Sequence, residues 1–509
     1  MMTITRLLED QAARYGDRTF CFCDDREYSF RTLNDHAARV AGNLAAQGVG
    51  EQDKVLLLMG NNVEFLYLFF GLGRIGAVCV PINPQLKPHE IAYIATNSEA
   101  RVLVTIPEMA PLLPTLKSLL PKLGHVYVIG DAPEAARPFS ELLAPVDAVP
   151  PIAARSDSEA ALIYTSGTTG QPKGVVLTHM NYVSNARMIS KSTSLTANDR
   201  FLCVLPMYHV NAQVVTVLTP LTVGADFALM SRFNPRAILP MIAKYRPTIM
   251  SAVPTIYHVM CSMPRAEEAD VSSIRFFVSG AAPLPEETYR TVQRVLKKPL
   301  VQGYGLSEAT CASAVADHLD PIKWDSVGPA LPYTGVRIVD EQGKDLPAGK
   351  VGEILVSGPA VMAGYYKDPE ATKSVFQEGW LRTGDLGRFD QEGYLFIAGR
   401  LKDMIIRGGV NIYPQQVENV LASLEGVAEC CVVGVDESRW GQEVLAVIKP
   451  VESVTLKEGQ VIDFCRDRLA AYKCPRYVRF VDEFPKTATG KIKKQEVAER
   501  FADTARDLS

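Results

Sequence analysis

A segment rich in glycine and hydroxyl groups is the strongest chemical feature of this sequence. Residues 164–174 read YTSGTTGQPKG and follow an apolar stretch. Glycines allow a backbone with positive φ that exposes N–H groups, the hydroxyls add donors, and Lys173 adds a positive charge. Such a loop suits a polyphosphate, although Pro172 before the lysine departs from the P-loop pattern. A surface turn can have the same composition, so composition alone leaves both interpretations open.

Shorter segments carry further groups that could act on a nucleotide. Residues 303–308 read GYGLSE, in which an aromatic ring between glycines could stack on a purine and is followed by a hydroxyl and a carboxylate. Asp385 ends the segment TGD, and segments 399–403 and 485–491 place an arginine or a lysine beside a glycine. All of these patterns also occur in ordinary turns and solvated surfaces, so none identifies a site by itself.

Alternating strands and helices must hold these segments in place. Apolar, strand-like runs recur beside amphipathic segments such as 32–47 and 62–74, which predicts an α/β architecture of parallel sheets covered by helices. Asn62 or Asn61 could cap the second of these helices. The predicted strands are 54–59, 77–82, 102–106, 126–129, 160–165 and 275–279.

The pattern of predicted secondary structure changes twice towards the carboxyl terminus. After about residue 330, short strands and turns predict a β-rich subdomain. After residues 399–403, helix-like and strand-like segments predict one small α+β domain. We therefore expect a large domain over residues 1–399, with the β-rich subdomain at about 330–399, a hinge at 400–402 and a small mobile domain over 403–509.

Composition excludes several other classes of protein. Apolar residues make up 47% of the 509 residues and charged residues 22%, as in ordinary globular domains. A formal net charge of −4 gives no field to attract nucleic acid, so no nucleic-acid partner is expected. The ten cysteines show neither disulfide nor zinc spacing, and the first residues lack an apolar signal segment, which favours a cytoplasmic protein. Arg74 interrupts the longest apolar stretch, 65–82, so no transmembrane segment is expected.

Taken together, the segments resemble the adenylate-forming superfamily, which comprises acyl-CoA synthetases, adenylation domains of peptide synthetases and beetle luciferases. Residues 164–174 resemble its phosphate loop, and further blocks follow in the family's order across nearly the whole chain. These blocks are LPMYHVN (205–211), SGAAPL (279–284), QGYGLSE (302–308), WLRTGD (380–385), GRLKD (399–403), RGG (407–409) and PKTATGK (485–491). The resemblance implies a large domain of two doubly wound sheets and a β-barrel, followed by a small mobile domain.

The resemblance also implies where ATP binds. Tyr304 would stack on adenine, Ser307 would contact the α-phosphate, and Glu308 would hold Mg²⁺, a cation that prefers oxygen ligands. Asp385, assisted by Arg400, would accept hydrogen bonds from the ribose hydroxyls. The other implied nucleotide-binding residues are Thr165, Ser166, Gly167, Thr168, Thr169, Lys173, Ala281, Ala282 and Gly303.

By the same resemblance, the small domain supplies the catalytic lysine. Lys491 would bridge the substrate carboxylate and the α-phosphate, where an ammonium stabilises developing charge. Lys493 and Lys494 are expected to be solvated. Lys402 matches the family's hinge, and Gly409 would let the pantetheine arm of CoA pass close to the backbone.

The implied acyl pocket is small and mostly apolar. His209 would screen it from the nucleotide and move aside for the thiol, which makes this residue a gate and not a base. Residues 208–213 contain no carboxylate to meet an α-ammonium group, so an α-amino acid is disfavoured, while Asn211 and Gln213 could either bind a polar acid or satisfy backbone groups. The implied pocket residues are His209, Asn211, Val253, Gly280, Ala281, Gly305 and Ala309.

These expectations combine into an AMP-forming acyl-CoA synthetase. A carboxylate would attack the α-phosphate of Mg·ATP to give an acyl adenylate and pyrophosphate, and the CoA thiol would then displace AMP. Both steps need positioning and charge stabilisation rather than a protein nucleophile. The expected acid is a medium- or long-chain fatty acid. An aryl or carnitine-like acid, an enzyme that loads a carrier protein, and a homodimeric assembly are left open.

Overall fold

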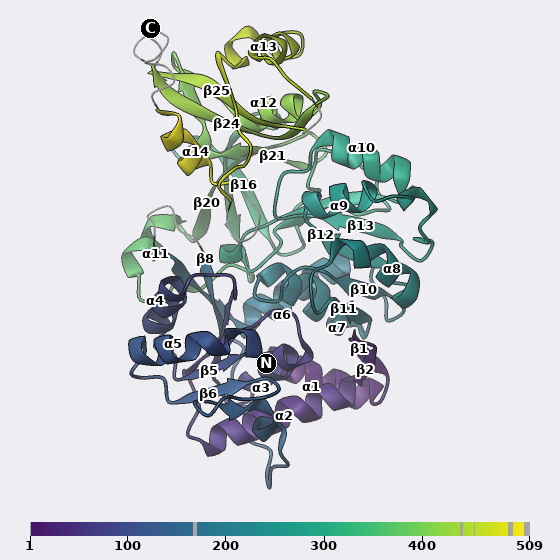
Figure 1. Cartoon of the computed structure of the whole chain (residues 1–509), viewed down its shortest axis with the longest axis vertical. Helices are drawn as coiled ribbons and strands as arrows, with labels where there is room; N and C mark the ends of the chain where they lie inside the picture. Colours follow the sequence, from purple (N-terminus) through teal and green to yellow (C-terminus); the bar gives the residue numbers. More distant parts are fainter. Residues whose placement is uncertain (1, 166–170, 438–440, 452–453, 487–491, 503–509) are drawn as a thin grey trace.

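The computed structural model describes residues 2–165, 171–437, 441–451, 454–486 and 492–502. Its N-terminal helices lie at one end of the molecule, and the sheet formed by the C-terminal part lies at the other (Figure 1). Several expected site residues lie outside the described residues, namely Ser166, Gly167, Thr168, Thr169 and Lys491.

The first large sheet contains eight described strands. In spatial order they are β15 (Ala314–Val315), β14 (Leu300–Tyr304), β13 (Phe276–Ser279), β12 (Ile249–Ala252), β10 (Arg200–Cys203), β11 (Asp226–Leu229), β1 (Thr19–Cys23) and β2 (Arg26–Ser29). The inner strands run parallel, and only the edge strands β15 and β2 run antiparallel to their neighbours. The carboxyl ends of β10, β12, β13 and β14 therefore lie side by side along one edge.

The second large sheet, also of eight described strands, carries the glycine- and hydroxyl-rich segment. Its order is β18 (Gly364–Tyr365), β9 (Lys173–Thr178), β8 (Glu159–Thr165), β4 (Val78–Ile82), β3 (Lys54–Leu58), β5 (Val102–Thr105), β6 (His125–Val128) and β7 (Arg137–Pro138). Strands β8 and β9 form an antiparallel hairpin in which Thr165 pairs with Lys173. Strand β18 reaches β9 from a distant part of the chain and pairs antiparallel with it.

Helices cover both sheets, as the alternation of the sequence predicts. They are α1 (Ile4–Tyr15), α2 (Phe30–Ala46), α3 (Val63–Leu72), α4 (Pro88–Ser98), α5 (Leu113–Leu119), α6 (His179–Ser192), α7 (Thr219–Val223), α8 (Pro235–Tyr245), α9 (Pro254–Cys261) and α10 (Glu286–Val295). Asn62 caps α3 by accepting a hydrogen bond from the backbone N–H of Phe65, so it is the capping residue of the two candidates. Helix α3 is buried along its length and leads into β4, which accounts for the apolar stretch 65–82.

One hydrophobic core extends between the two sheets and includes side chains of α1, α2, α3 and α6. Phe69 of α3 and Tyr182 of α6 belong to this core and meet edge to face, with ring centroids 5.6 Å apart. Full burial of such a side chain contributes about 1.5–3 kcal/mol, so this core fixes the two sheets relative to one another. No helix among the described residues is long and apolar enough to cross a membrane.

The region expected to be β-rich is an antiparallel sheet of five described strands. These are β16 (Gly335–Val339), β17 (Gly352–Ser357), β20 (Trp380–Phe389), β19 (Phe376–Gln377) and β21 (Leu395–Arg400), with α11 (Pro369–Val375) beside them. Asp385 pairs with Arg400 across β20 and β21. The pairing of these two strands therefore places an acidic and a basic residue of the expected site next to each other.

The C-terminal part is a second antiparallel sheet with one added parallel strand. Its described elements are β22 (Ile405–Arg407), β23 (Val410–Ile412), α12 (Pro414–Leu421), β24 (Val427–Glu437), β25 (Gly441–Pro450), α13 (Glu458–Arg466), β26 (Tyr477–Phe480) and α14 (Lys494–Arg500). Separate hydrophobic clusters cover its two faces. A sheet with a core on each face matches the expected small α+β module.

The remaining described elements are single turns of helix and one wider segment. They are η1 (Pro107–Leu112), η2 (Phe139–Leu143), η4 (Ala266–Glu268), η5 (Ser307–Ala309), η6 (Leu401–Asp403), η7 (Ala471–Lys473) and the π-helix η3 (Ala212–Leu218). Three of them, η3, η5 and η6, begin or lie within segments that the sequence analysis assigned to the site.

Candidate active site

Expected acyl-pocket residues leave neighbouring strands at the same edge of the first sheet. His209 and Asn211 follow β10, Val253 follows β12, and Gly280 follows β13. A Cβ placed on Gly280 would lie 3.4 Å from the carbonyl oxygen of Gly303 and 4.0 Å from Asn211 Nδ2, so these three residues are close neighbours. In open α/β sheets this carboxyl edge is where ligands bind.

A buried hydrogen-bonded frame holds the loop that carries His209. Asn61 Nδ2 donates to the carbonyl oxygens of Leu205 and Met230, both at 3.0 Å, and its Oδ1 accepts from the N–H of Met207 at 2.7 Å. These bonds join parts of the chain that lie more than a hundred residues apart. Because both the amide nitrogen and the amide oxygen of Asn61 have hydrogen-bond partners, this buried polar side chain fixes the loop without leaving an unpaired polar atom.

Gln213 belongs to this frame and not to the surface that faces a substrate. Its Nε2 donates to the carbonyl oxygen of Met207 at 2.7 Å, and its Oε1 accepts from the hydroxyl of Tyr182 at 2.6 Å. Gln213 is 1% exposed, so of its two possible roles the structure shows the one that satisfies backbone.

Asn211 behaves differently from its neighbour. It lies at the start of the π-helix η3, a rare form that is often found at functional sites. Its Oδ1 is buried and accepts no hydrogen bond from the described residues, while its Nδ2 lies beside Gly280. Buried polar atoms usually have partners, so this oxygen is a candidate contact for a bound group. Tyr208 and His209 form an aromatic pair next to it, with ring centroids 4.7 Å apart.

The small residues at the edge are small for different reasons. A Cβ on Gly305 would lie 1.6 Å from the carbonyl oxygen of Cys311, so the packing of the chain itself requires glycine there. A Cβ on Gly303 would lie 3.5 Å from the carbonyl oxygen of Ala314 and 3.7 Å from Val315 Cγ2, both ordinary contact distances, so packing within the chain does not require glycine there. Ala281 has φ 64°, a left-handed conformation that costs about 1–2 kcal/mol for a residue other than glycine. Ala309 is buried.

Tyr304, Asp385 and Arg400 form a network at the expected nucleotide site. The hydroxyl of Tyr304 donates to Asp385 Oδ2 at 2.8 Å, and Arg400 Nε pairs with Asp385 Oδ1 at 3.0 Å. Asp385 is 6% exposed, and its N–H donates to the hydroxyl of Thr383 at 3.0 Å. Burial, followed by the nearby Asp385 carboxylate, raises the pKa of Tyr304 well above its ordinary value, so Tyr304 stays a hydrogen-bond donor. Sequence analysis missed this bond, because the two residues are far apart in the chain.

Glu308 and Lys173 meet on the two sides of a tyrosine that the sequence analysis did not single out. Tyr365, in β18, donates its hydroxyl to Glu308 Oε1 at 3.0 Å. The ammonium of Lys173 lies 5.2 Å from the centroid of the same ring. Ser307 and Glu308 lie in η5, directly after the strand that ends in Tyr304. The structure therefore brings the start of the second sheet's hairpin next to the end of the first sheet's strand β14.

The C-terminal residues occupy exposed turns. Lys402 lies in η6, between β21 and β22, and is exposed. Gly409 follows Gly408 in the turn between β22 and β23, and both have positive φ, as a two-residue hairpin of type I′ requires. Nothing lies within 4 Å of a Cβ placed on Gly409, so its surroundings are open.

The expectation that Lys494 is solvated is wrong. Lys494 Nζ lies 2.6 Å from Glu418 Oε1, which also accepts from the N–H of Val432 at 2.8 Å. The Glu418 carboxylate is the largest influence that raises the pKa of Lys494, against the opposing effect of burial. The pair ties α14 to α12 and β24. Lys493 is exposed, as expected, and pairs with the exposed Glu496.

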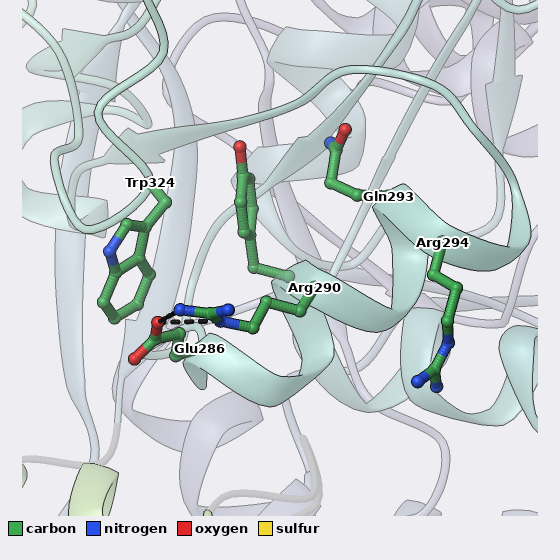
Figure 2. A pocket seen from close by; sticks show the side chains of 6 residues that line it. Glu286, Arg290, Gln293, Arg294 and Trp324 are labelled. Atoms are coloured by element: carbon green, nitrogen blue, oxygen red, sulfur yellow. Dashed lines mark hydrogen bonds and ion pairs between the residues drawn. The ribbon is translucent and has the colours of Figure 1, made fainter.

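A hollow of about 450 Å³ on α10 does not coincide with these residues (Figure 2). It is lined by Glu286, Tyr289, Arg290, Gln293, Arg294 and Trp324. Arg290 Nε donates to Glu286 Oε1 at 2.8 Å, so these two charges largely neutralise each other. Since it contains none of the expected site residues, we do not assign the chemistry to it.

Comparison with protein-family models finds two matches. Residues 8–366 match the AMP-binding enzyme family, and residues 416–491 match the AMP-binding enzyme C-terminal domain. Three relatives are similar over nearly their whole length. They are a feruloyl-CoA synthase of Amycolatopsis sp (38% identical, covering 93% of this chain and 94% of the relative), an indoleacetate–CoA ligase of Aromatoleum aromaticum (36%, 98% and 98%) and the long-chain-fatty-acid–CoA ligase FadD13 of Mycobacterium tuberculosis (35%, 94% and 94%).

Solved structures of related proteins share the fold. The anthranilate CoA ligase AuaEII in complex with anthranoyl-AMP superposes with a TM-score of 0.92 at 30% identity, covering 100% of this chain and 98% of that one. ATP-bound MatB from Rhodopseudomonas palustris gives 0.91 at 31% identity, with 99% and 100% covered, whereas apo MatB gives 0.81 at 32% identity with the same shares covered. These matches confirm the α/β fold and the resemblance read from the sequence. The chain therefore belongs to the AMP-binding enzyme family, within its acid–thiol ligase branch.

Proposed function

We propose that this protein is an AMP-forming ligase that joins a hydrophobic carboxylic acid to CoA in two steps. A carboxylate oxygen attacks the α-phosphorus of ATP, the bond to pyrophosphate breaks, and an acyl adenylate forms. The thiol sulfur of CoA then attacks the acyl carbon, AMP leaves, and the thiol proton passes to solvent. The observation that carries this proposal is the convergence of the Tyr304–Asp385–Arg400 network with Asn211 and Gly280 on neighbouring strand ends.

In this proposal Asp385 binds the ribose. Its Oδ2 accepts a hydrogen bond from the Tyr304 hydroxyl and its Oδ1 forms an ion pair with Arg400, which together orient the carboxylate. A carboxylate has about four acceptor sites, so it is a suitable partner for ribose hydroxyls. The ring of Tyr304 would stack on adenine, with Ala281 and Ala282 beside it. Thr165, Lys173 and Ser307 would contact the phosphates; this is supported by Tyr365, which contacts both Lys173 at the start of β9 and Glu308 next to Ser307.

Glu308 fits Mg²⁺ as a single protein carboxylate. No group of three or more His, Cys, Asp or Glu side chains among the described residues could hold a metal. Mg²⁺ is usually bound by one or two carboxylates together with substrate phosphates and water, so one carboxylate beside a phosphate site is a suitable donor set. When bound, Mg²⁺ would neutralise charge on the phosphates.

We propose that the C-terminal part moves between the two steps about Lys402. The domains would be residues 1–399 and 403–509, joined by the hinge 400–402. Lys491 would serve adenylation, and Gly409 would line the path of pantetheine after the movement. Two observations support this proposal. The described residues of η6 and of the β22–β23 turn are mostly exposed, and the structure superposes better on ATP-bound MatB (TM-score 0.91) than on apo MatB (0.81), as we would expect if the arrangement of the parts changes with the bound nucleotide.

Among hydrophobic acids, an aryl acid is the first candidate. The names of three related proteins refer to aryl or arylalkyl substrates, feruloyl, indoleacetate and anthranilate, and the Tyr208–His209 pair offers an aromatic wall. A medium- or long-chain fatty acid is the second candidate, supported by the similarity to FadD13. A carnitine-like acid loses support because Gln213 is occupied, which leaves Asn211 as the polar contact.

An acid panel tests these proposals. Purified protein is incubated with ATP, Mg²⁺ and CoA and with aryl, fatty, carnitine-like and amino acids, and both pyrophosphate and CoA thioester are measured. We expect both products with hydrophobic acids, and aryl acids to give the highest kcat/KM. Pyrophosphate release without thioester would instead indicate a protein that loads a carrier, and dependence on an amino acid would contradict the proposed pocket.

The cytoplasm is the proposed location, because all ten cysteines are free thiols in the structure. Cell fractionation tests this. The homodimer stays a prediction of the sequence analysis, to be checked by sedimentation.

A further inference from the structure

Tyr365 stands between two oppositely charged residues of the proposed phosphate site. Its hydroxyl donates to Glu308 Oε1 at 3.0 Å, while the face of its ring meets the ammonium of Lys173, 5.2 Å from the centroid. Within the described ranges, Lys173 and Glu308 do not pair with one another. The tyrosine thus contacts a residue of each large sheet's site segment and separates their charges.

The backbone fixes Tyr365 independently of its hydroxyl. Tyr365 pairs with Val175 across β18 and β9, and the N–H of Tyr366 donates to the carbonyl oxygen of Gly174 at 2.7 Å. On the other side, the N–H of Tyr365 donates to the hydroxyl of Thr372 at 2.8 Å. Removal of the hydroxyl alone should therefore leave the ring and the strand in place.

Both contacts of Tyr365, the hydrogen bond to Glu308 and the cation–π contact with Lys173, involve a charged group. A hydrogen bond to an ionised acceptor is stronger than one between neutral groups, and an ammonium over an aromatic face is attracted by the ring quadrupole. Tyr365 can therefore act on both charged residues through these two contacts alone.

We propose that Tyr365 is a positioning residue for the adenylation step, which rests on the proposed function. The hydroxyl fixes the Glu308 carboxylate, which would hold the metal that accompanies the nucleotide, and the ring holds the Lys173 ammonium apart from that carboxylate. Without the ring, the two charges can pair with each other, and both are then withdrawn from the phosphates.

Equilibrium binding of ATP, measured by calorimetry without acid substrate, tests the proposal. For Tyr365→Phe, we expect the gain in affinity caused by Mg²⁺ to fall about tenfold or more, because a hydrogen bond to a charged group is lost. Affinity in EDTA should stay within about twofold, because the ring still faces Lys173. Tyr365→Leu should also lose affinity in EDTA. A gain from Mg²⁺ equal to that of the wild type would overturn the proposal.

Kinetics separate a positioning role from a merely structural one. Tyr365→Phe should raise the KM for Mg·ATP and slow pyrophosphate exchange, yet convert a synthetic acyl adenylate and CoA to thioester within about twofold of the wild type. Equal loss in both half-reactions, together with a lower melting temperature, would overturn it. The matched control is Tyr127→Phe. Tyr127 lies on β6, away from the site, and its hydroxyl donates to Gln47, so its removal should change neither the KM for Mg·ATP nor the rate of pyrophosphate exchange.

Failure of the proposed function looks different. One outcome is that Mg²⁺ raises the affinity of the wild type for ATP, that this gain falls in Tyr365→Phe, and that the wild type forms no adenylate with any acid. In that case the proposed function is wrong, and the positioning role of Tyr365 in Mg·ATP binding stands. If the wild type forms adenylate and Tyr365→Phe keeps the full gain from Mg²⁺, the function stands and the role of Tyr365 is wrong.

Discussion

The large part of the molecule holds its site residues in a buried frame, whereas the C-terminal part presents its site residues on exposed turns. Asn61 and Gln213 are buried and fully bonded, and Asp385 is 6% exposed with bonds to both oxygens. Lys402 and Gly409 are exposed, and Gly409 has open space around it. This contrast is what we expect if, as proposed, the large part holds a preformed site for the nucleotide and the acid and the C-terminal part moves towards it between the two steps.

Replacement of Lys491 should separate the two half-reactions. We expect Lys491→Ala to slow acyl-adenylate formation at least about 10²–10³-fold, since one group that stabilises developing charge is worth that much. A preformed adenylate should still react with CoA, because that step would use the other arrangement of the C-terminal part. Single-turnover assays of each half-reaction measure both effects.

The control for this variant is Lys493→Ala, whose exposed ion pair with Glu496 contributes little. Equal losses in both half-reactions of Lys491→Ala would count against the division of labour between the two parts.

Acid should destabilise the large part selectively. Burial lowers the pKa of His179 to about 4, against 6.5 in the unfolded chain. The unfolded state therefore binds the proton more readily, and the free energy of unfolding should fall by about 3 kcal/mol as the pH drops from about 6.5 to about 4, with no further loss from this group below that. Urea titrations at several pH values measure the slope.

The variant His179→Gln should flatten this pH dependence, and His89→Gln, at an exposed position, should not. All seven histidines lie before residue 400, so the effect should be confined to the large part. If hydrogen exchange shows that β24 and β25 of the C-terminal part open first between pH 6.5 and 4, this prediction is contradicted.

The Asp385 network should control the affinity for ATP. Asp385→Asn removes the charge that receives bonds from Tyr304 and Arg400, so we expect the KM for ATP to rise about 10–100-fold, equivalent to about 1.5–3 kcal/mol. Tyr304→Phe should have a smaller effect of the same kind. Asp345→Asn, which changes an exposed carboxylate paired with Arg337, is the matched control. An unchanged KM in Asp385→Asn would remove this network from the nucleotide site.

The smallest effect is expected within the C-terminal part. Lys494→Met keeps the apolar stem and removes the charge that pairs with Glu418, so the stability of this part should fall by about 1 kcal/mol. Adenylation should drop only a few-fold, because Lys494 anchors α14 but does not contact substrate in the proposal. Exchange protection of β24, compared with that of Lys493→Ala, checks the change; no difference between the two variants would contradict the anchoring role.

Local patterns were enough to predict six strands of the two large sheets, but not β1, β2, β9, β10, β11, β12 or β14. The predicted strand 54–59 differs from β3 by one residue, and the predicted strand 102–106 differs from β5 by one, because apolar runs report burial directly. The order of the blocks predicted the family and the fold, both of which the comparisons confirm. The roles of individual site residues stay predictions.

Long-range contacts could not be predicted from one sequence. Asn61 and Asn62 look alike in the sequence, yet only Asn62 caps α3, while Asn61 bonds to Leu205 across the molecule. Tyr365 and Glu418 had no local signal, because their partners come from other elements. The wrong prediction for Lys494 has the same cause. A run of charged residues is usually solvated, and only the folded structure shows that Lys494 pairs with Glu418.

Exchange of radiolabelled pyrophosphate into ATP, with and without an aryl or fatty acid, is the decisive test of adenylate formation. We expect exchange that depends on both the acid and Mg²⁺ and that is strongly reduced in Lys491→Ala. Well-folded wild-type protein that binds ATP but shows no exchange with any acid of the panel would contradict it.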